Sequence, residues 1–322
     1  MKLALYAFLI CFALSFILFY LMIPLLRRIK AGQPILAYVK EHESKGGTPT
    51  MGGLMVFLPS SILCLLFTRN GALSLFSVSV TLSYMIVGFL DDYIKIKTRK
   101  NEGLKPYQKI LFQLVVAVVG AFFAYRNGIT FLHLPFFNQT VFLGIWIIPL
   151  FIVAFLSITN SVNLTDGLDG LAGMVGLVYL IVMGIVISVQ AAGAVSRGEL
   201  DSLTIFSFAT AGGILAFLCF NFHPAKIFMG DTGSMALGGL IGCVSMFSGN
   251  CLYMLVLGIM FVLSSISVIV QVVWYKRTKR RVFRMAPLHH HLQMCGMKEG
   301  KIAFIYATVT LLFGVGLLVG IL

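Results

Sequence analysis

Two adjacent aspartates, Asp91 and Asp92, stand at the end of a long apolar stretch of the chain. Ionisable groups at the edge of such a segment are costly to place and usually serve a function. Adjacent carboxylates concentrate negative charge, which can hold Mg²⁺ or supply a general base. The alternative is a solvated helix end at which a carboxylate pairs with Lys95. The pair is therefore a candidate catalytic or metal-binding site.

A second polar segment lies between two further apolar stretches. Asn160, Asn163, Asp166 and Asp169 recur at intervals of three residues, and residues three apart share one face of a helix. Each aspartate is followed by a glycine, which permits a turn and a close approach of a ligand to the backbone. This density of polar groups favours a ligand site over an ordinary polar turn.

A third segment precedes another apolar stretch and carries Asp231 between two glycines. The N-terminus of the following helix offers free N–H groups and the positive end of a dipole, which suit phosphate. The Asp231 carboxylate is a natural ligand for a hard metal ion, and Phe228 could stack on a base. The alternative is that Asp231 or Thr232 merely caps the helix.

Three consecutive histidines, His289, His290 and His291, follow Pro287-Leu288. Successive residues on a helix point about 100° apart, so all three cannot face one site. We expect one or two of them to contact a substrate while another holds the loop. No Cys/His pair stands at zinc-ligand spacing nearby, which disfavours zinc.

A glycine-rich segment runs from Lys45 to Gly53 and includes Thr50. Its backbone, lysine and threonines could cradle a phosphate. The segment lacks the Gly-Lys-Ser/Thr order of a P-loop, and taken alone it also fits a flexible loop.

Long apolar stretches separate these motifs. The chain has 322 residues, 59% of them hydrophobic, and a mean hydropathy of +0.98. A helix that spans a bilayer needs about 20 mostly apolar residues, whereas a transmembrane barrel would show short alternating segments. The candidate spans are 3–26, 51–67, 73–90, 108–125, 142–160, 170–190, 203–221, 234–249, 251–274 and 302–322. The sequence therefore predicts an all-α polytopic membrane protein of about ten transmembrane helices, with residues 1–322 forming a single integral membrane catalytic domain.

The charged residues orient these spans. One set of alternating loops holds 20 of the 24 Lys and Arg residues, and the exceptions are Lys2, Arg69, Arg126 and Arg197. Because Lys and Arg accumulate in cytoplasmic loops, this set is predicted to be cytoplasmic and both termini to lie outside. The same rule explains the net charge of +13, so no nucleic-acid partner is expected. The outer loop near 127–140 alternates enough to form a small hairpin.

The acidic residues lie mostly on the same side as the basic ones. Only Glu199 and Asp201 of the eleven acidic residues fall on the outer side. The active site is therefore predicted at the cytoplasmic face. A transporter or lipid flippase would instead place polar residues at the bilayer midplane and on both faces. The first apolar stretch is too long for a signal peptide, so we interpret it as a retained span.

Together these motifs resemble those of the phospho-N-acetylmuramoyl-pentapeptide transferases, a branch of the polyprenyl-phosphate N-acetylhexosamine-1-phosphate transferases. The resemblance covers essentially the whole chain, and Pro287–Gln293 is its most specific part. The other matching stretches are Lys45–Gly53, Asp91-Asp92, Asn160–Gly170 and Asn221–Ser234. A sister enzyme that uses a different UDP-sugar is the nearest alternative.

The resemblance implies a reaction in which undecaprenyl phosphate attacks UDP-MurNAc-pentapeptide to give lipid I and UMP in peptidoglycan synthesis. It implies a Mg²⁺ cofactor, a homodimer among membrane lipids, and a location in the bacterial cytoplasmic membrane. It assigns catalytic roles to Asp91, Asp92, Asp231 and His289, with Asp231 also a Mg²⁺ ligand. It assigns substrate contacts to Lys45, Thr50, Lys109, Asn163, Asp166, Asp169, Asn221, Phe228 and His290.

Overall fold

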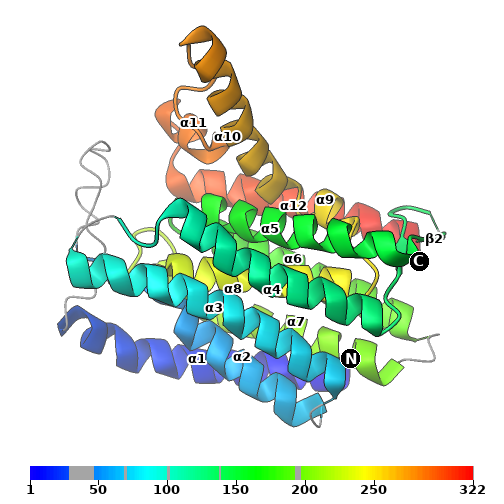
Figure 1. Ribbon diagram of the computed structural model, residues 1–322. Coiled ribbons are helices and arrows are strands. Elements are labelled where there is room, and N and C mark those ends of the chain that lie inside the picture. The colour runs from blue at the N-terminus through cyan, green and yellow to red at the C-terminus, as the bar shows by residue number, and fades with distance from the viewer. Residues whose placement is uncertain (29–46, 69–70, 100–101, 138, 193–196, 322) are drawn as a thin grey trace.

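The chain folds into a bundle of long helices (Figure 1). The computed structural model describes residues 1–28, 47–68, 71–99, 102–137, 139–192 and 197–321. Its long helices are α1 (Lys2–Arg28), α2 (Gly53–Thr68), α3 (Ala72–Thr98), α4 (Pro106–Arg126), α5 (Ile147–Thr165), α6 (Leu171–Ala191), α7 (Arg197–Asn221), α8 (Gly230–Met246), α10 (Ile259–Thr278) and α12 (Glu299–Ile321). Within the described ranges, eight helices are long and apolar enough to cross a membrane. The prediction of a polytopic helical membrane protein is confirmed.

Two of the predicted spans form helices that are shorter than these eight: α2 has 16 residues and α8 has 17. Every residue of α8 except Asp231 is buried, because α3 and α5 pack along it and α2, α6 and α7 also contact it. A helix enclosed by protein can carry small residues in place of lipid-facing apolar ones. At Gly238, for example, an added Cβ would lie 2.6 Å from the Cα of Thr159 on α5.

The predicted span 251–274 is divided into two helices, α9 (Tyr253–Leu257) and α10, with Gly258 between them. Glycine at this point lets the chain change direction, since it lacks the side chain that would restrict the backbone. Helix α10 leaves the bundle at a steep angle and carries α11 (Leu288–Met294) with it (Figure 1).

A small antiparallel hairpin connects α4 to α5, through the 3₁₀ turn Gly144–Trp146. Its strands are β1 (Phe131–His133) and β2 (Thr140–Phe142), with Leu132 opposite Val141. This confirms the hairpin predicted near 127–140. Figure 1 shows the hairpin at the same end of the bundle as both chain termini, as the predicted arrangement requires.

Candidate active site

Three carboxylates meet where α3 contacts the first turn of α8. Asp91, Asp92 and Asp231 each offer an oxygen, and these oxygens lie within 4.8 Å of one another. The two helices can approach this closely because α3 has Gly88 one turn before the aspartates. A Cβ at Gly88 would collide with the backbone carbonyl of Asp231. The predicted acid pair and the predicted segment around Asp231 are thus parts of one site.

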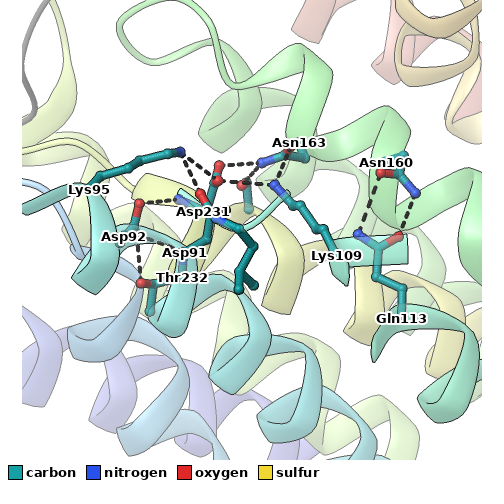
Figure 2. A network of polar contacts seen from close by, with 11 residues as sticks. Asp91, Asp92, Lys95, Lys109, Gln113, Asn160, Asn163, Asp231 and Thr232 are labelled. Atoms are coloured by element: carbon teal, nitrogen blue, oxygen red, sulfur yellow. Dashed lines mark hydrogen bonds and ion pairs between the residues drawn. The ribbon is translucent and has the colours of Figure 1, made fainter. Parts of the chain in front are cut away.

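Asp231 is the centre of this cluster, as Figure 2 shows. Its Oδ2 lies 2.9 Å from Lys95 Nζ and 3.0 Å from Lys109 Nζ. Its Oδ1 accepts a 2.7 Å hydrogen bond from the side-chain amide of Asn163. Two cations and one amide from α3, α4 and α5 therefore stabilise the ionised form of a carboxylate on α8.

Asp92 has a different environment, because its carboxylate caps α8. Oδ1 accepts the Asp231 N–H at 3.2 Å, and Oδ2 accepts the Thr232 N–H at 2.9 Å and the Thr232 hydroxyl at 2.7 Å. The first N–H groups of a helix have no partner within it, and a carboxylate there also meets the positive end of the helix dipole. Asp92 therefore fixes the backbone that carries Asp231.

Asp91 is held by the loop that follows α3. Its Oδ1 accepts the Leu104 N–H at 2.8 Å, and its Oδ2 lies 2.6 Å from Lys95 Nζ. A Cβ at Gly103 would approach this carboxylate to 2.5 Å, so the loop is packed directly on it. Lys95 consequently links Asp91 to Asp231.

Two sets of side-chain hydrogen bonds join α4 to α5 beside the carboxylate cluster (Figure 2). Lys109 Nζ donates to Asn163 Oδ1 at 3.3 Å. One turn further along both helices, Asn160 donates to Gln113 Oε1 at 2.7 Å, and the Gln113 amide donates back at 3.5 Å. Asn163 also donates to Ser234 Oγ on α8 at 2.8 Å. These contacts fix the register in which Lys109 and Asn163 reach Asp231.

The three-carboxylate cluster fits a hard cation. Mg²⁺ prefers oxygen ligands and is commonly bound by one or two carboxylates together with substrate phosphates. A second group of possible ligands, Asp169, His223 and Glu299, lies elsewhere among the described residues. It includes a nitrogen ligand, and its Asp169 and His223 bond directly to one another at 2.9 Å. The donor chemistry therefore favours the first group for Mg²⁺.

The loop between α5 and α6 forms the second part of the site. Asp169 Oδ2 contacts His223 Nδ1 and accepts the Ala225 N–H at 3.2 Å. Asn221 accepts the Gly170 N–H and donates to the Ile227 carbonyl, both at 2.8 Å. Asn221 thus joins this loop to the segment that leads into α8.

The structure describes two of the other predicted site residues, Phe228 and Thr50, but not Lys45. Phe228 is partly buried, and its backbone pairs with that of Pro49 and Gly52. Thr50 is buried, and a Cβ at Gly230 would come within 2.5 Å of its hydroxyl oxygen. Lys45 lies outside the described residues.

The histidine run divides as the helical geometry predicts. His289 is fully buried, and its ring lies 4.5 Å from that of His290. A Cβ at Gly167 would lie 2.6 Å from His289 Nε2 and 3.1 Å from His290 Nε2, so both rings face the α5–α6 loop. His291 instead accepts the Arg284 N–H and holds its own loop. Burial, and then the charge of His290, lowers the pKa of His289 to about 3, so its ring is neutral near pH 7.

Comparison with known proteins agrees with this arrangement. Residues 74–249 match glycosyl transferase family 4. The chain is 41% identical to a phospho-N-acetylmuramoyl-pentapeptide-transferase of Clostridium botulinum (strain Eklund 17B / Type B), over 95% of this chain and 93% of that protein. It is 40% identical to the protein of the same name from Geobacillus sp. (strain WCH70), over 95% and 94% of the two chains. The chain belongs to the phospho-N-acetylmuramoyl-pentapeptide-transferase family.

Some residues of this family member were not predicted from its sequence as parts of the site. Lys95 appeared only as a possible partner of a solvated helix end, yet it contacts two of the three carboxylates. Its spacing of four residues from Asp91 was the available signal. Gln113 and Glu299 had no local signal, because their partners lie 47 and 130 residues away in the sequence.

Asp166 lies in the α5–α6 loop between the two parts of the site of this transferase-family chain. Burial, and then the charges of Asp231, Asp92 and Asp169, raise its pKa to about 8. The folded protein therefore keeps a proton that the unfolded chain releases near pH 4. This proton uptake lowers the stability of the fold as the pH rises from about 4 to about 8.

We therefore expect Asp166→Asn to raise the melting temperature, with a gain that grows from pH 5 to pH 8. The gain at pH 8 should be on the order of 1–3 kcal/mol, because partial exposure screens part of the charge effect. Thermal unfolding of the purified protein across this pH range measures it. The exposed Glu102→Gln variant is the control. A gain that is the same at pH 5 and pH 8 would contradict the assigned protonation.

Proposed function

We propose that this protein transfers phospho-MurNAc-pentapeptide from UDP-MurNAc-pentapeptide to undecaprenyl phosphate, giving lipid I and UMP. The observation that carries the proposal is the cluster of three carboxylates and two lysines at one end of a membrane-spanning bundle. Phosphoryl transfer needs positioning and charge neutralisation more than covalent chemistry by the protein. Relatives that are about 40% identical along nearly the whole chain carry the matching name.

The proposed cofactor is Mg²⁺, held by Asp231 with the help of Asp91. When bound, Mg²⁺ would neutralise charge on the donor pyrophosphate. Lys95 and Lys109 add positive charge at the same place, and they hold Asp231 ionised. Asp92 keeps the first turn of α8 in position. Asp91, under the loop that follows α3, is the carboxylate that would orient the incoming lipid phosphate.

The α5–α6 loop and the segment before α8 are the proposed nucleotide and sugar region. There Phe228 would stack on uracil, and Asp169 would accept a hydrogen bond from its N–H. Further contacts are proposed for Lys45, Thr50, Lys109, Asn163, Asp166, Asn221 and His290. A catalytic role is proposed for His289 as well, and because its ring is neutral and buried it would be exerted by shaping this region.

We expect Phe228→Ala to weaken binding of both UMP and the UDP-sugar about 5- to 150-fold, because base stacking is worth about 1–3 kcal/mol. Isothermal titration calorimetry with UMP measures the effect. Phe142→Ala is the control, since Phe142 lies on strand β2 of the hairpin, outside the proposed nucleotide region, and is 76% exposed. Unchanged UMP binding in Phe228→Ala would refute the stacking role.

The proposed setting is the bacterial inner membrane, with the site at the cytoplasmic face and residues 1–322 acting as one catalytic domain. The distribution of Lys and Arg supports this orientation. The position of the hairpin and both termini at one end of the bundle also supports it. The proposed partners are the two substrates, membrane lipids and a second copy of the chain. No nucleic acid is proposed.

Release of UMP by the purified protein tests the function directly. We expect UMP from UDP-MurNAc-pentapeptide only when undecaprenyl phosphate and Mg²⁺ are both present. UDP-N-acetylglucosamine should give none under the same conditions. Release from UDP-N-acetylglucosamine alone would identify a sister transferase, and no release from either donor would refute the proposal.

A further inference from the structure

Glu299, in the first turn of α12, contacts two separate elements of the site. Its Oε2 accepts the backbone N–H of Asp169 at 3.1 Å. Its Oε1 accepts the side-chain amide N–H of Gln293, on α11, at 3.3 Å. One carboxylate thus joins α12 to the α5–α6 loop and to the histidine helix.

The connection continues from Gln293 to His290. Gln293 Oε1 lies 3.2 Å from His290 Nδ1. Because the Gln293 amide donates through its nitrogen to Glu299, its oxygen is the acceptor toward the histidine, and Nδ1 carries the proton. In the neutral form of the ring, Nε2 is then the acceptor nitrogen. That nitrogen faces Gly167, where an added Cβ would approach it to 3.1 Å.

Asp169 is fixed at two points by this arrangement. Glu299 holds its backbone N–H, while its carboxylate contacts His223 and the Ala225 N–H. The side-chain direction of Asp169 therefore depends on where Glu299 holds its backbone. The Glu299 carboxylate therefore positions Asp169 and His290 relative to each other, although the two residues are 121 positions apart in the sequence.

We propose that Glu299 and Gln293 are positioning residues for the nucleotide part of the site, an inference that rests on the proposed function. They act through Asp169 and His290. They serve binding of the uridine nucleotide, because their hydrogen bonds lead to Asp169 and His290 in the proposed nucleotide region. We call the hydrogen bonds that link Asp169, Glu299, Gln293 and His290 the bridge. Loss of this bridge should therefore weaken nucleotide binding with little change in the maximal rate.

Each single variant disturbs the bridge, which consists of the hydrogen bonds of Glu299 with the Asp169 N–H and with Gln293, and of Gln293 with His290. In Glu299→Gln, one acceptor oxygen faces two N–H donors, so either a hydrogen bond is lost or the Gln293 amide turns over and the His290 proton moves from Nδ1 to Nε2. In Gln293→Glu, two carboxylates face each other. We expect each variant to raise the KM for the UDP-sugar and the Kd for UMP about 10-fold, while kcat stays within about twofold.

The double variant Gln293→Glu with Glu299→Gln restores the three hydrogen bonds of the bridge with the net charge unchanged. The glutamine at 299 accepts the Asp169 N–H through its oxygen and donates through its nitrogen to the new carboxylate at 293. That carboxylate accepts the His290 Nδ1–H. We expect the KM and Kd of this double variant to return to within about threefold of the unmodified protein.

The readouts are UMP binding by calorimetry, UMP release under varied donor and varied undecaprenyl phosphate, and the melting temperature. Glu199→Gln is the matched control, because Glu199 is an acid in the first turn of α7 and lines the same cavity as the hairpin residues Phe131 and His133. The control should change none of the values. The KM for undecaprenyl phosphate should stay unchanged in all variants.

A double variant as impaired as the single variants would overturn the inference. Single variants that lower the melting temperature and kcat while leaving UMP binding intact would also overturn it, since they would show a purely structural role. An unmodified protein that binds UMP but releases none from the donor would refute the proposed function alone, and the bridge would still be tested by the Kd for UMP. An unmodified protein that binds no UMP would refute both.

Discussion

The Asp231→Asn variant is expected to lose turnover by about 100-fold or more and to lose its response to Mg²⁺. The carboxylate of Asp231 contacts three side chains, those of Lys95, Lys109 and Asn163. A neutral amide is a poorer ligand for a hard cation. The change also removes the counter-ion that two partly buried lysines share. The free-energy cost of leaving a buried charge without its partner usually exceeds the stabilisation that the ion pair gave.

Rates of UMP release over a Mg²⁺ titration, donor binding and melting temperature separate these effects. Asp91→Asn is the comparison, since this carboxylate shares Lys95 but faces the loop after α3. We expect it to lose turnover while still binding the donor. Asp201→Asn, near the start of α7 and so at the opposite end of that helix from Asn221, should resemble the unmodified protein. Near-normal turnover in Asp91→Asn, together with normal Mg²⁺ dependence in Asp231→Asn, would show that the site is wrongly assigned.

Much of the fold could be predicted because a bilayer imposes a length on each apolar stretch. The hairpin was also predictable, since strand alternation is a local pattern. The departure of α10 from the bundle was not. Its sequence is apolar enough to span a membrane, and its direction follows from the break at Gly258 and from the packing of α11.

The site was predictable in its parts but not in its assembly. Local composition identified Asp91, Asp92 and Asp231, each at the end of an apolar stretch. It suggested Asp231 or Thr232 as the cap of α8, whereas the capping carboxylate is Asp92 from another helix. A contact between residues 140 apart in the sequence leaves no trace in local spacing.

The histidines show the same division. The helical angle between successive residues predicted that one histidine would hold the loop, and His291 does so. Which ring is buried depends on α12, where Tyr306 packs against His289 with ring centroids 6.4 Å apart. Tertiary packing therefore decides that His289 is the neutral, enclosed ring.

The Gly88→Ala variant is expected to lose both stability and turnover. An alanine Cβ there would meet the backbone carbonyl of Asp231 and would also come within 2.7 Å of the Thr232 nitrogen. These atoms belong to the first turn of α8, which cannot move aside as a flexible side chain would. Alanine favours a helix by about 1 kcal/mol over glycine, but overpacking costs about 1–3 kcal/mol and more where the obstacle is backbone. Overpacking should therefore prevail.

The same collision should separate Asp91 and Asp92 from Asp231, because Gly88 sits one turn from the acid pair. A displacement of about 1 Å at a reacting centre can reduce turnover about 100-fold. Gly316→Ala is the matched control: this glycine is also inside a helix, is exposed, and has its nearest neighbour at 3.9 Å. We expect it to keep normal turnover and a melting temperature at least as high as that of the unmodified protein. Equal behaviour of the two variants in thermal unfolding and UMP release would show that close contact between α3 and α8 is not what holds the three carboxylates together.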